Sequence, residues 1–119
     1  MTEKFDLVLK DGTIMTPKGP LAADLAILNG KIAALGSFKA HETKKTMSCK
    51  GLYILPGLID SQVHFREPGN EHKEDLESGT AAAVLGGVTT IFDMPNTKPS
   101  TTNAAALADK LHRAKGRAW

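Results

Sequence analysis

Short stretches in which apolar and polar residues alternate fill the first half of the chain, and residues typical of turns separate them. The alternation predicts short strands at residues 5–10, 13–16, 23–28 and 31–35. Asp11-Gly12 and Asn29-Gly30 are dipeptides that favour tight hairpins between such strands, and residues 18–20 are expected to break the chain. These signals together predict a meander of short strands.

A polar stretch without a pattern follows at residues 37–46, and we expect it to form a surface loop in which His41 is solvated. Two further short strands are expected at residues 47–49 and 52–54. Cys49 is the single cysteine, and no His or Asp arrangement near it suggests an activated thiol. We therefore expect Cys49 to be a small core residue.

The second half of the chain changes from the spacing of strands to that of helices. Residues 54–59 form an apolar run typical of a buried strand, and polar residues follow it directly. Beyond them the pattern predicts a helix over residues 71–85, a strand over 88–94, a second helix from about residue 103 with Thr101 or Thr102 as its cap, and the start of a third strand at 117–119. Gly86-Gly87 and Gly116 are expected to end the two helices.

This order of elements predicts an α/β fold with a parallel sheet, because helices of this length serve as crossovers between parallel strands. Two or three parallel strands neither cover both faces of a sheet nor close a barrel. We therefore expect the 119 residues to stop partway through a domain, so that the chain is a fragment of a longer protein. Such a fragment is expected to be poorly soluble or partly unfolded in isolation.

Composition and charge are those of an ordinary globular protein, with 41% hydrophobic residues, 24% charged residues and a net charge of +2. Because the charge is small and scattered, it argues against nucleic acid or a membrane as a partner. The opening residues lack the apolar core of a secretory signal, and no apolar run approaches the roughly 18 residues of a membrane span. We expect a cytoplasmic protein.

The densest cluster of polar side chains lies in the stretch LPGLIDSQVHFREPG, residues 55–69. In an extended chain one side of this stretch carries Asp60, Gln62, His64 and Arg66, and the other carries Ile59, Ser61, Val63 and Phe65. One face is thus able to pack while the other lines a polar site. Active sites of parallel α/β folds form at the carboxyl ends of the strands, which is where this polar face leads.

The end of the next strand delivers Asp93, which we expect to be structural, and Asn96. The planar guanidinium of Arg66 suits a carboxylate, and the Asn96 amide is able to donate a further bond to the same group, so that together they suggest an anionic substrate. An equally weighted alternative is that Arg66 pairs with Glu67, Glu71 or Glu74. Asp60 either orients a neighbouring ligand from behind or caps the strand end with its side chain.

The motifs LPGLIDSQVHFREPG and GGVTTIFDMPNTKP resemble the N-terminal portion of a dihydroorotase of the long-chain type, within the amidohydrolase superfamily of cyclic amide hydrolases. The resemblance covers essentially the whole chain. It implies a metal-dependent hydrolase in which a (β/α)8 barrel lies between the two halves of a small β-sandwich domain. Residues 1–53 would then be the N-terminal part of that composite β-sandwich. Residues 54–119 would be the first two βα units of a TIM-type barrel.

The resemblance also implies roles for individual residues. In the family a His-x-His motif on the first barrel strand supplies two metal ligands, and an arginine two residues later binds the substrate carboxylate. His64 matches the second ligand, and Arg66 and Asn96 match the two carboxylate contacts. Position 62, where the first histidine is expected, holds Gln62. Because a glutamine carbonyl binds zinc far more weakly than an imidazole, this metal position is weakened or rebuilt.

Such a protein would use one or two zinc ions to open the ring of dihydroorotate reversibly to N-carbamoyl-aspartate, a step of pyrimidine biosynthesis. Most zinc ligands would lie outside this chain, so we expect no catalytic residue within it. Allantoinases and hydantoinases usually differ at the arginine, so Arg66 favours dihydroorotate. The alternatives are an inactive dihydroorotase-like scaffold, and an allantoinase or other cyclic amidase. The expected partners are the small anionic substrate and either a second copy of the chain or another enzyme of the pyrimidine pathway.

Overall fold

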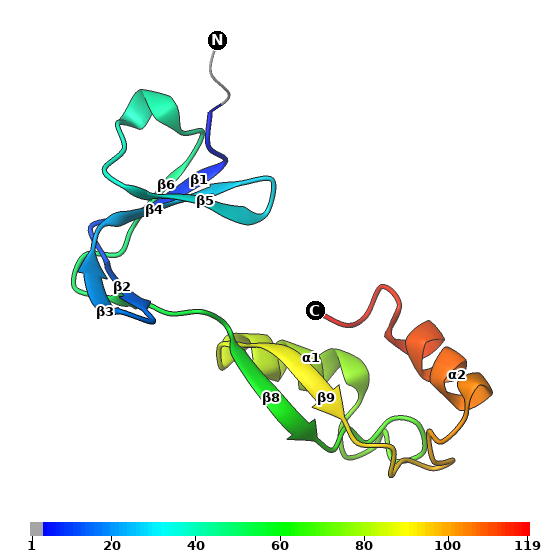
Figure 1. Ribbon diagram of the computed structural model, residues 1–119. Coiled ribbons are helices and arrows are strands. Elements are labelled where there is room, and N and C mark those ends of the chain that lie inside the picture. The colour runs from blue at the N-terminus through cyan, green and yellow to red at the C-terminus, as the bar shows by residue number, and fades with distance from the viewer. Residues whose placement is uncertain (1–3) are drawn as a thin grey trace. The chain divides into compact units, whose positions relative to one another are not determined.

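The structure is a computed structural model that describes residues 4–119, and it divides into two compact units between Pro56 and Gly57. The first residues of the chain, on which the expected absence of a secretory signal partly rests, lie outside the described residues. Figure 1 shows that strands dominate the first unit, whereas strands and helices alternate in the second. The chain is therefore α/β and rich in strands.

Two small sheets make up the first unit. One has four strands in the order β5-β4-β1-β6, and the other has three strands in the order β3-β2-β7. The strands are β1 (Leu7–Lys10), β2 (Thr13–Thr16), β3 (Gly19–Ala22), β4 (Asp24–Leu28), β5 (Lys31–Gly36), β6 (Thr46–Ser48) and β7 (Tyr53–Ile54), and a short 3-10 helix, η1, spans Ala40–Glu42. The β-rich character predicted for this part is confirmed, whereas its membership of a sandwich shared by both chain ends stays a prediction.

The hairpin predicted at Asn29-Gly30 joins β4 and β5. Asn29 has a φ of +52° and Gly30 a φ of +72°, as a two-residue turn between right-twisted strands requires. The Asn29 N–H also donates to Asp6 Oδ2 at 2.7 Å, which ties the turn to the segment before β1.

The hairpin predicted at Asp11-Gly12 is wrong. β1 and β2 belong to different sheets, and Asp11, with a φ of +61°, turns the chain from one sheet to the other. The Asp11 N–H donates to the buried carboxylate of Asp24 at 3.0 Å. Gly12 lies so close to Ile54 that an added Cβ would stand 2.7 Å from Cδ1 of that side chain. Contacts with β4 and β7 thus decide the course of the chain here.

The core of the first unit is small and consists of Val8, Ile14, Leu25, Ala26 and Cys49. The prediction that Cys49 is a core residue is confirmed. The break predicted at residues 18–20 is replaced by β3, because residues 19–22 pair antiparallel with β2.

The second unit contains β8 (Leu58–Val63), α1 (Leu76–Leu85), β9 (Val88–Asp93) and α2 (Ala104–Ala114). The predicted order of strand, helix, strand and helix is confirmed, and β8 and β9 pair in parallel, as Figure 1 shows. Two parallel strands do not test whether this sheet is the start of a barrel, so that assignment stays a prediction. The apolar run at residues 54–59 is divided: Ile54 belongs to β7, and β8 begins only at Leu58.

α1 begins later than the pattern predicts, whereas α2 begins close to the predicted residue 103 but has a different cap. α1 starts at Leu76 rather than at residue 71, because Asp75 is its N-cap and accepts hydrogen bonds from the Ser78 N–H and hydroxyl, both at 2.7 Å. Residues 71–73 form a turn instead, so His72 does not lie on a helix. Asn103, and not a threonine before it, caps α2 by accepting from the Ala106 N–H at 2.9 Å.

The third strand predicted at residues 117–119 is also wrong. Gly116, with a φ of +74°, lies just beyond the end of α2, as predicted for a glycine that stops a helix. The chain continues through a turn and not as a strand. The Arg117 side chain points back to Glu67, 50 residues earlier in the sequence, and this contact directs the chain after α2. Among the helices of the described residues, none is both long and apolar enough to cross a membrane.

Candidate functional site

The carboxyl ends of β8 and β9 lie side by side, as expected for neighbouring parallel strands. The Met94 N–H donates to the Val63 carbonyl at 2.8 Å, and the Phe65 N–H donates to Asp93 Oδ1 at 3.0 Å. Asp93 also accepts from Lys110 Nζ of α2 at 2.6 Å. Asp93 therefore has the structural role expected of it, since it joins both strand ends to a helix.

The loops that follow the two strands, residues 64–75 and 94–102, are joined to each other. The Lys98 N–H donates to the Pro68 carbonyl at 3.0 Å. Gly69 packs so closely on Lys98 that an added Cβ would overlap the carbonyl oxygen of that residue. Buried Thr97 closes the second loop by donating to the Pro99 carbonyl at 2.9 Å. Side chains on one loop are therefore held relative to those on the other.

His64 and Asn96 form a hydrogen bond between these loops, with Nδ1 of His64 3.0 Å from Oδ1 of Asn96. Because an amide oxygen only accepts, this pair requires a proton on Nδ1 of the imidazole, and in the neutral ring Nε2 then carries the lone pair. The NH2 group of Asn96 remains able to donate to a further acceptor. The structure thus brings together two of the predicted site residues.

Arg66 lies on the same loop as His64 and is exposed to solvent. The alternative in which it pairs with a neighbouring glutamate is not found: Glu67 and Glu71 are in contact with arginines near the end of the chain, and Glu74 does not pair with Arg66. Among residues 4–119, no hydrogen bond or ion pair involves the Arg66 guanidinium. It is therefore available to bind an anion.

Arg66 is exposed between two buried residues. Phe65 and Glu67 are buried, with exposed fractions of 5% and 3%. Phe65 packs on Gly79 of α1, where an added Cβ would stand 2.6 Å from Cε1 of the ring. His64 and Arg66, on either side of Phe65, are exposed to solvent instead. The alternation predicted along β8 holds in this part only, because Ile59, which was expected to pack, is 66% exposed in the described unit.

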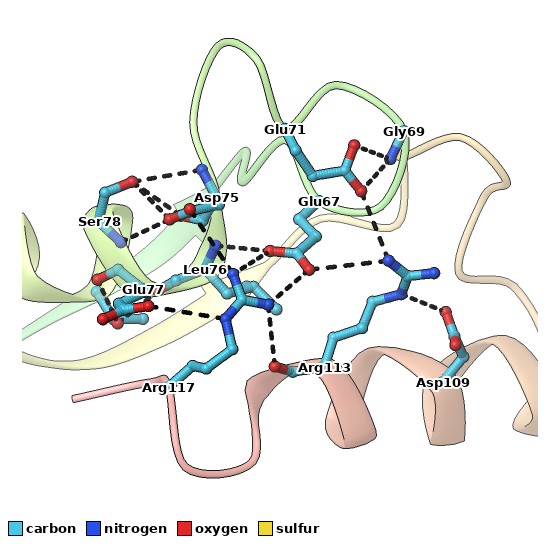
Figure 2. Close-up of polar contacts among 11 residues, drawn as sticks. Glu67, Gly69, Glu71, Asp75, Leu76, Glu77, Ser78, Asp109, Arg113 and Arg117 are labelled. Atoms are coloured by element: carbon cyan, nitrogen blue, oxygen red, sulfur yellow. Dashed lines mark hydrogen bonds and ion pairs between the residues drawn. The ribbon is translucent and has the colours of Figure 1, made fainter.

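Glu67 is the centre of an ionic cluster that the sequence did not reveal (Figure 2). Its carboxylate accepts from Arg117 Nη1 at 2.9 Å and Nη2 at 3.1 Å, and from the Leu76 N–H at 3.0 Å. The hydrogen bonds from Arg117 are the main reason that the pKa of Glu67 lies below its ordinary value, in spite of burial. No local signal links two residues 50 positions apart, so this pair was not predictable.

Gln62 and Asp60 occupy exposed positions of β8. Asp60 Oδ1 accepts from the Gln62 N–H at 3.1 Å, and this local bond lies within β8 rather than at its end, where one of the two expectations placed an Asp60 cap. The other expectation, that the Asp60 carboxylate orients a neighbouring metal ligand without binding the metal itself, stays a prediction.

The side chains of residues 4–119 do not complete the metal centre that the resemblance implies. His64 offers one ring nitrogen and Gln62 a neutral amide oxygen, and no group of three or more His, Cys, Asp or Glu side chains is placed to hold a metal within the described range. Catalytic zinc sites use at least three protein ligands. The residues described here therefore do not form a metal site by themselves.

Comparisons with known proteins agree with the resemblance at the level of the family. Residues 53–119 match the sequence profile of the amidohydrolase family. The chain is 40% identical over 114 residues to an allantoinase of Escherichia coli strain K12, a match that covers 95% of this chain and 25% of the relative. It thus spans about a quarter of the length of the curated relatives that it matches.

Solved structures give the same result. An L-hydantoinase (dihydropyrimidinase) from Arthrobacter aurescens superposes with a TM-score of 0.79 at 32% sequence identity, over 92% of this chain and 25% of that one. A zinc complex of an N-acyl-D-glutamate deacylase from Bordetella bronchiseptica gives a TM-score of 0.56 at 27% identity, over 75% of this chain and 18% of that one.

Proposed function

The chain belongs to the amidohydrolase family, and on that basis we propose that the protein hydrolyses a cyclic amide that carries a carboxylate. The similarity to an allantoinase and to a hydantoinase supports a cyclic amide as the substrate class. The observation that carries the carboxylate is the exposed guanidinium of Arg66, which no acidic side chain of the described residues neutralises.

Dihydroorotate is the substrate that we propose first. Arg66 would bind its carboxylate through two parallel N–H groups, and the free NH2 group of Asn96 would donate a third hydrogen bond. The bond between Asn96 Oδ1 and His64 fixes the amide so that its NH2 group turns away from the imidazole. Each of the three residues thus has a separate role, since Arg66 binds, Asn96 orients, and His64 holds Asn96 in place.

Zinc is the metal that we propose for the protein, since a family neighbour was solved as a zinc complex. Of the two residues that the resemblance assigns to the metal, His64 offers a strong donor in Nε2, and Gln62 offers a weak one. In this proposal the described residues bind the substrate, and the ligands needed to activate water come from elsewhere in the protein. The number of zinc ions, the cytoplasmic location and assembly with a second copy or another pyrimidine-pathway enzyme stay predictions.

Two other functions have specific support. An allantoinase is favoured by the 40% identity to such an enzyme. An inactive scaffold that binds a partner enzyme is favoured by Gln62, since a protein without catalysis has no need for a strong metal ligand at that position.

In a protein that also carries the remaining metal ligands, rates of ring opening for dihydroorotate, allantoin and hydantoin distinguish these functions. We expect kcat/KM to be highest for dihydroorotate, with cyclisation of N-carbamoyl-aspartate as the reverse reaction. A preference for allantoin would support the allantoinase. A folded protein that turns over none of the three would support the scaffold.

A further inference from the structure

The ionic cluster around Glu67 lies next to the proposed carboxylate binder but takes no part in the proposed chemistry. Five carboxylates lie close together in the second unit, and two arginines from the end of the chain contact all of them: Glu67, Glu71, Asp75, Glu77 and Asp109 (Figure 2). Arg66 is adjacent to Glu67 in the sequence and takes no part in this cluster.

Burial makes the pairing of Glu67 necessary. The side chain is 4% exposed, and an ionised carboxylate in such a place requires a cation or several hydrogen-bond donors. Arg117 supplies a two-pronged contact at 2.9 and 3.1 Å, and Nη1 of Arg113 lies 3.8 Å away. If both arginines are removed, we expect the Glu67 carboxylate to pair with Arg66, which directly precedes it in the chain.

The same contact fixes the backbone around Arg66. Glu67 accepts from the Leu76 N–H, the first amide of α1, so its side chain is held on the helix side of the loop. The Phe65 ring packs on Gly79 of the same helix, and the Phe65 N–H donates to Asp93 of β9. Arg66, between these two buried residues, is the exposed one.

We propose that the ion pair between Glu67 and Arg117, with Arg113 beside it, positions Arg66. It keeps the Glu67 carboxylate turned toward α1 and neutralised, so that Arg66 stays unpaired at the end of β8 and free to bind an anionic group. The identity of that group rests on the proposed function, whereas the position of Arg66 is measurable without any substrate.

The test compares Arg113→Met/Arg117→Met with Glu67→Gln/Arg113→Met/Arg117→Met in protein labelled with 15N-arginine. The Arg66 Nε–H signal is assigned by its loss in Arg66→Lys. In the first variant the carboxylate recruits Arg66, and exchange of this proton with water slows by roughly tenfold or more, the protection expected of a charge-assisted hydrogen bond. Removing the charge of Glu67 as well restores fast exchange. If the ion pair only stabilised the fold, adding Glu67→Gln would not restore fast exchange of the Arg66 proton.

Arg117→Lys replaces the double variant if that variant does not fold. It keeps a cation beside Glu67, but one ammonium replaces the two-pronged contact only in part. We expect an intermediate slowing of Arg66 exchange. Glu77→Gln is the matched control, since Glu77 is 60% exposed and lies 3.8 Å from Arg117, and it should leave Arg66 unchanged. Unchanged Arg66 exchange in both Arg117→Lys and any folded double variant would overturn the proposal.

Kinetics then connect the position to the ligand. KM for dihydroorotate should rise in the Arg113→Met/Arg117→Met variant and recover in the triple variant, with kcat changed less than KM. If the wild-type protein turns over no cyclic amide, the proposed function fails while the exchange experiment still decides the role of the ion pair. Slowed and restored exchange with an unaltered KM in an active enzyme would overturn the link to ligand binding.

Discussion

The close approach of Gly69 to Lys98 joins the two loops of the candidate site, and Gly69→Ala tests its importance. Two costs are expected. Gly69 has a φ of +101°, a conformation that alanine adopts only with strain. Its new methyl group would also overlap the Lys98 carbonyl oxygen, which belongs to the backbone and cannot rotate away.

The two costs are separable by size. Backbone strain of this kind amounts to about 1–3 kcal/mol. Inserting a methyl group where no space exists adds about 1–3 kcal/mol, and the movement that relieves it also disturbs the hydrogen bond from Lys98 to Pro68. Gly87→Ala is the matched control, since Gly87 has a φ of +83° with no atom within 4 Å of an added Cβ. The difference between the two variants isolates the steric cost.

Urea unfolding followed by circular dichroism measures both free energies of unfolding. We expect Gly69→Ala to be less stable than Gly87→Ala by about 1–3 kcal/mol. Equal losses in the two variants would show that the loops do not press on each other at Gly69, and would contradict a fixed position of one loop relative to the other.

Three further predictions concern the other ionic contacts. Arg117 lowers the pKa of Glu67, so the ionised carboxylate stabilises the folded state above its unfolded pKa of about 4.3. This contribution to the free energy of unfolding is lost as the pH falls through the lower pKa of the folded state. Glu67→Gln should therefore flatten the decrease of stability that urea unfolding measures between about pH 5 and pH 2. Lys110→Met should cost about 1–3 kcal/mol in the same assay because Asp93 loses a partner at 2.6 Å, and Asp93→Asn/Lys110→Met should cost less than the sum of the two single changes; strict additivity would refute the coupling. Asp24→Asn should destabilise the first unit by about 1–3 kcal/mol, since the buried carboxylate binds Lys10 and the N–H groups of Asp11 and Phe38; a change below about 0.5 kcal/mol would contradict this role.

Local chemistry was predictable from the sequence wherever one short segment decides it. Asn29-Gly30 forms its hairpin, Gly86-Gly87 follows the end of α1, and the parallel order of the second unit follows from the change of period. Cys49 is buried, as expected for a cysteine with no activating residue near it in the sequence. In each of these cases the residues that matter are neighbours in the chain.

Predictions failed where distant contacts prevail. Asp11-Gly12 has the composition of a hairpin, but Asp24 and Ile54 lead the chain into a second sheet. Residues 117–119 resemble a strand, but Arg117 is drawn to Glu67. In the candidate site, His64, Arg66 and Asn96 were predictable from their positions near the ends of two strands. The ion pair of buried Glu67, which we propose positions Arg66, was not predictable because its partner Arg117 lies 50 residues away.

The effect of Arg66→Ala on a substrate with a carboxylate and on one without it tests the central claim most directly. Losing a charge-assisted, two-pronged contact of about 1.5–3 kcal/mol should lower kcat/KM for dihydroorotate by roughly 10- to 150-fold. For hydantoin, which offers no carboxylate, the change should stay below about threefold, within the scatter of a distant surface substitution. Equal losses for both substrates, or no loss for dihydroorotate, would contradict the assignment of Arg66 to the substrate carboxylate.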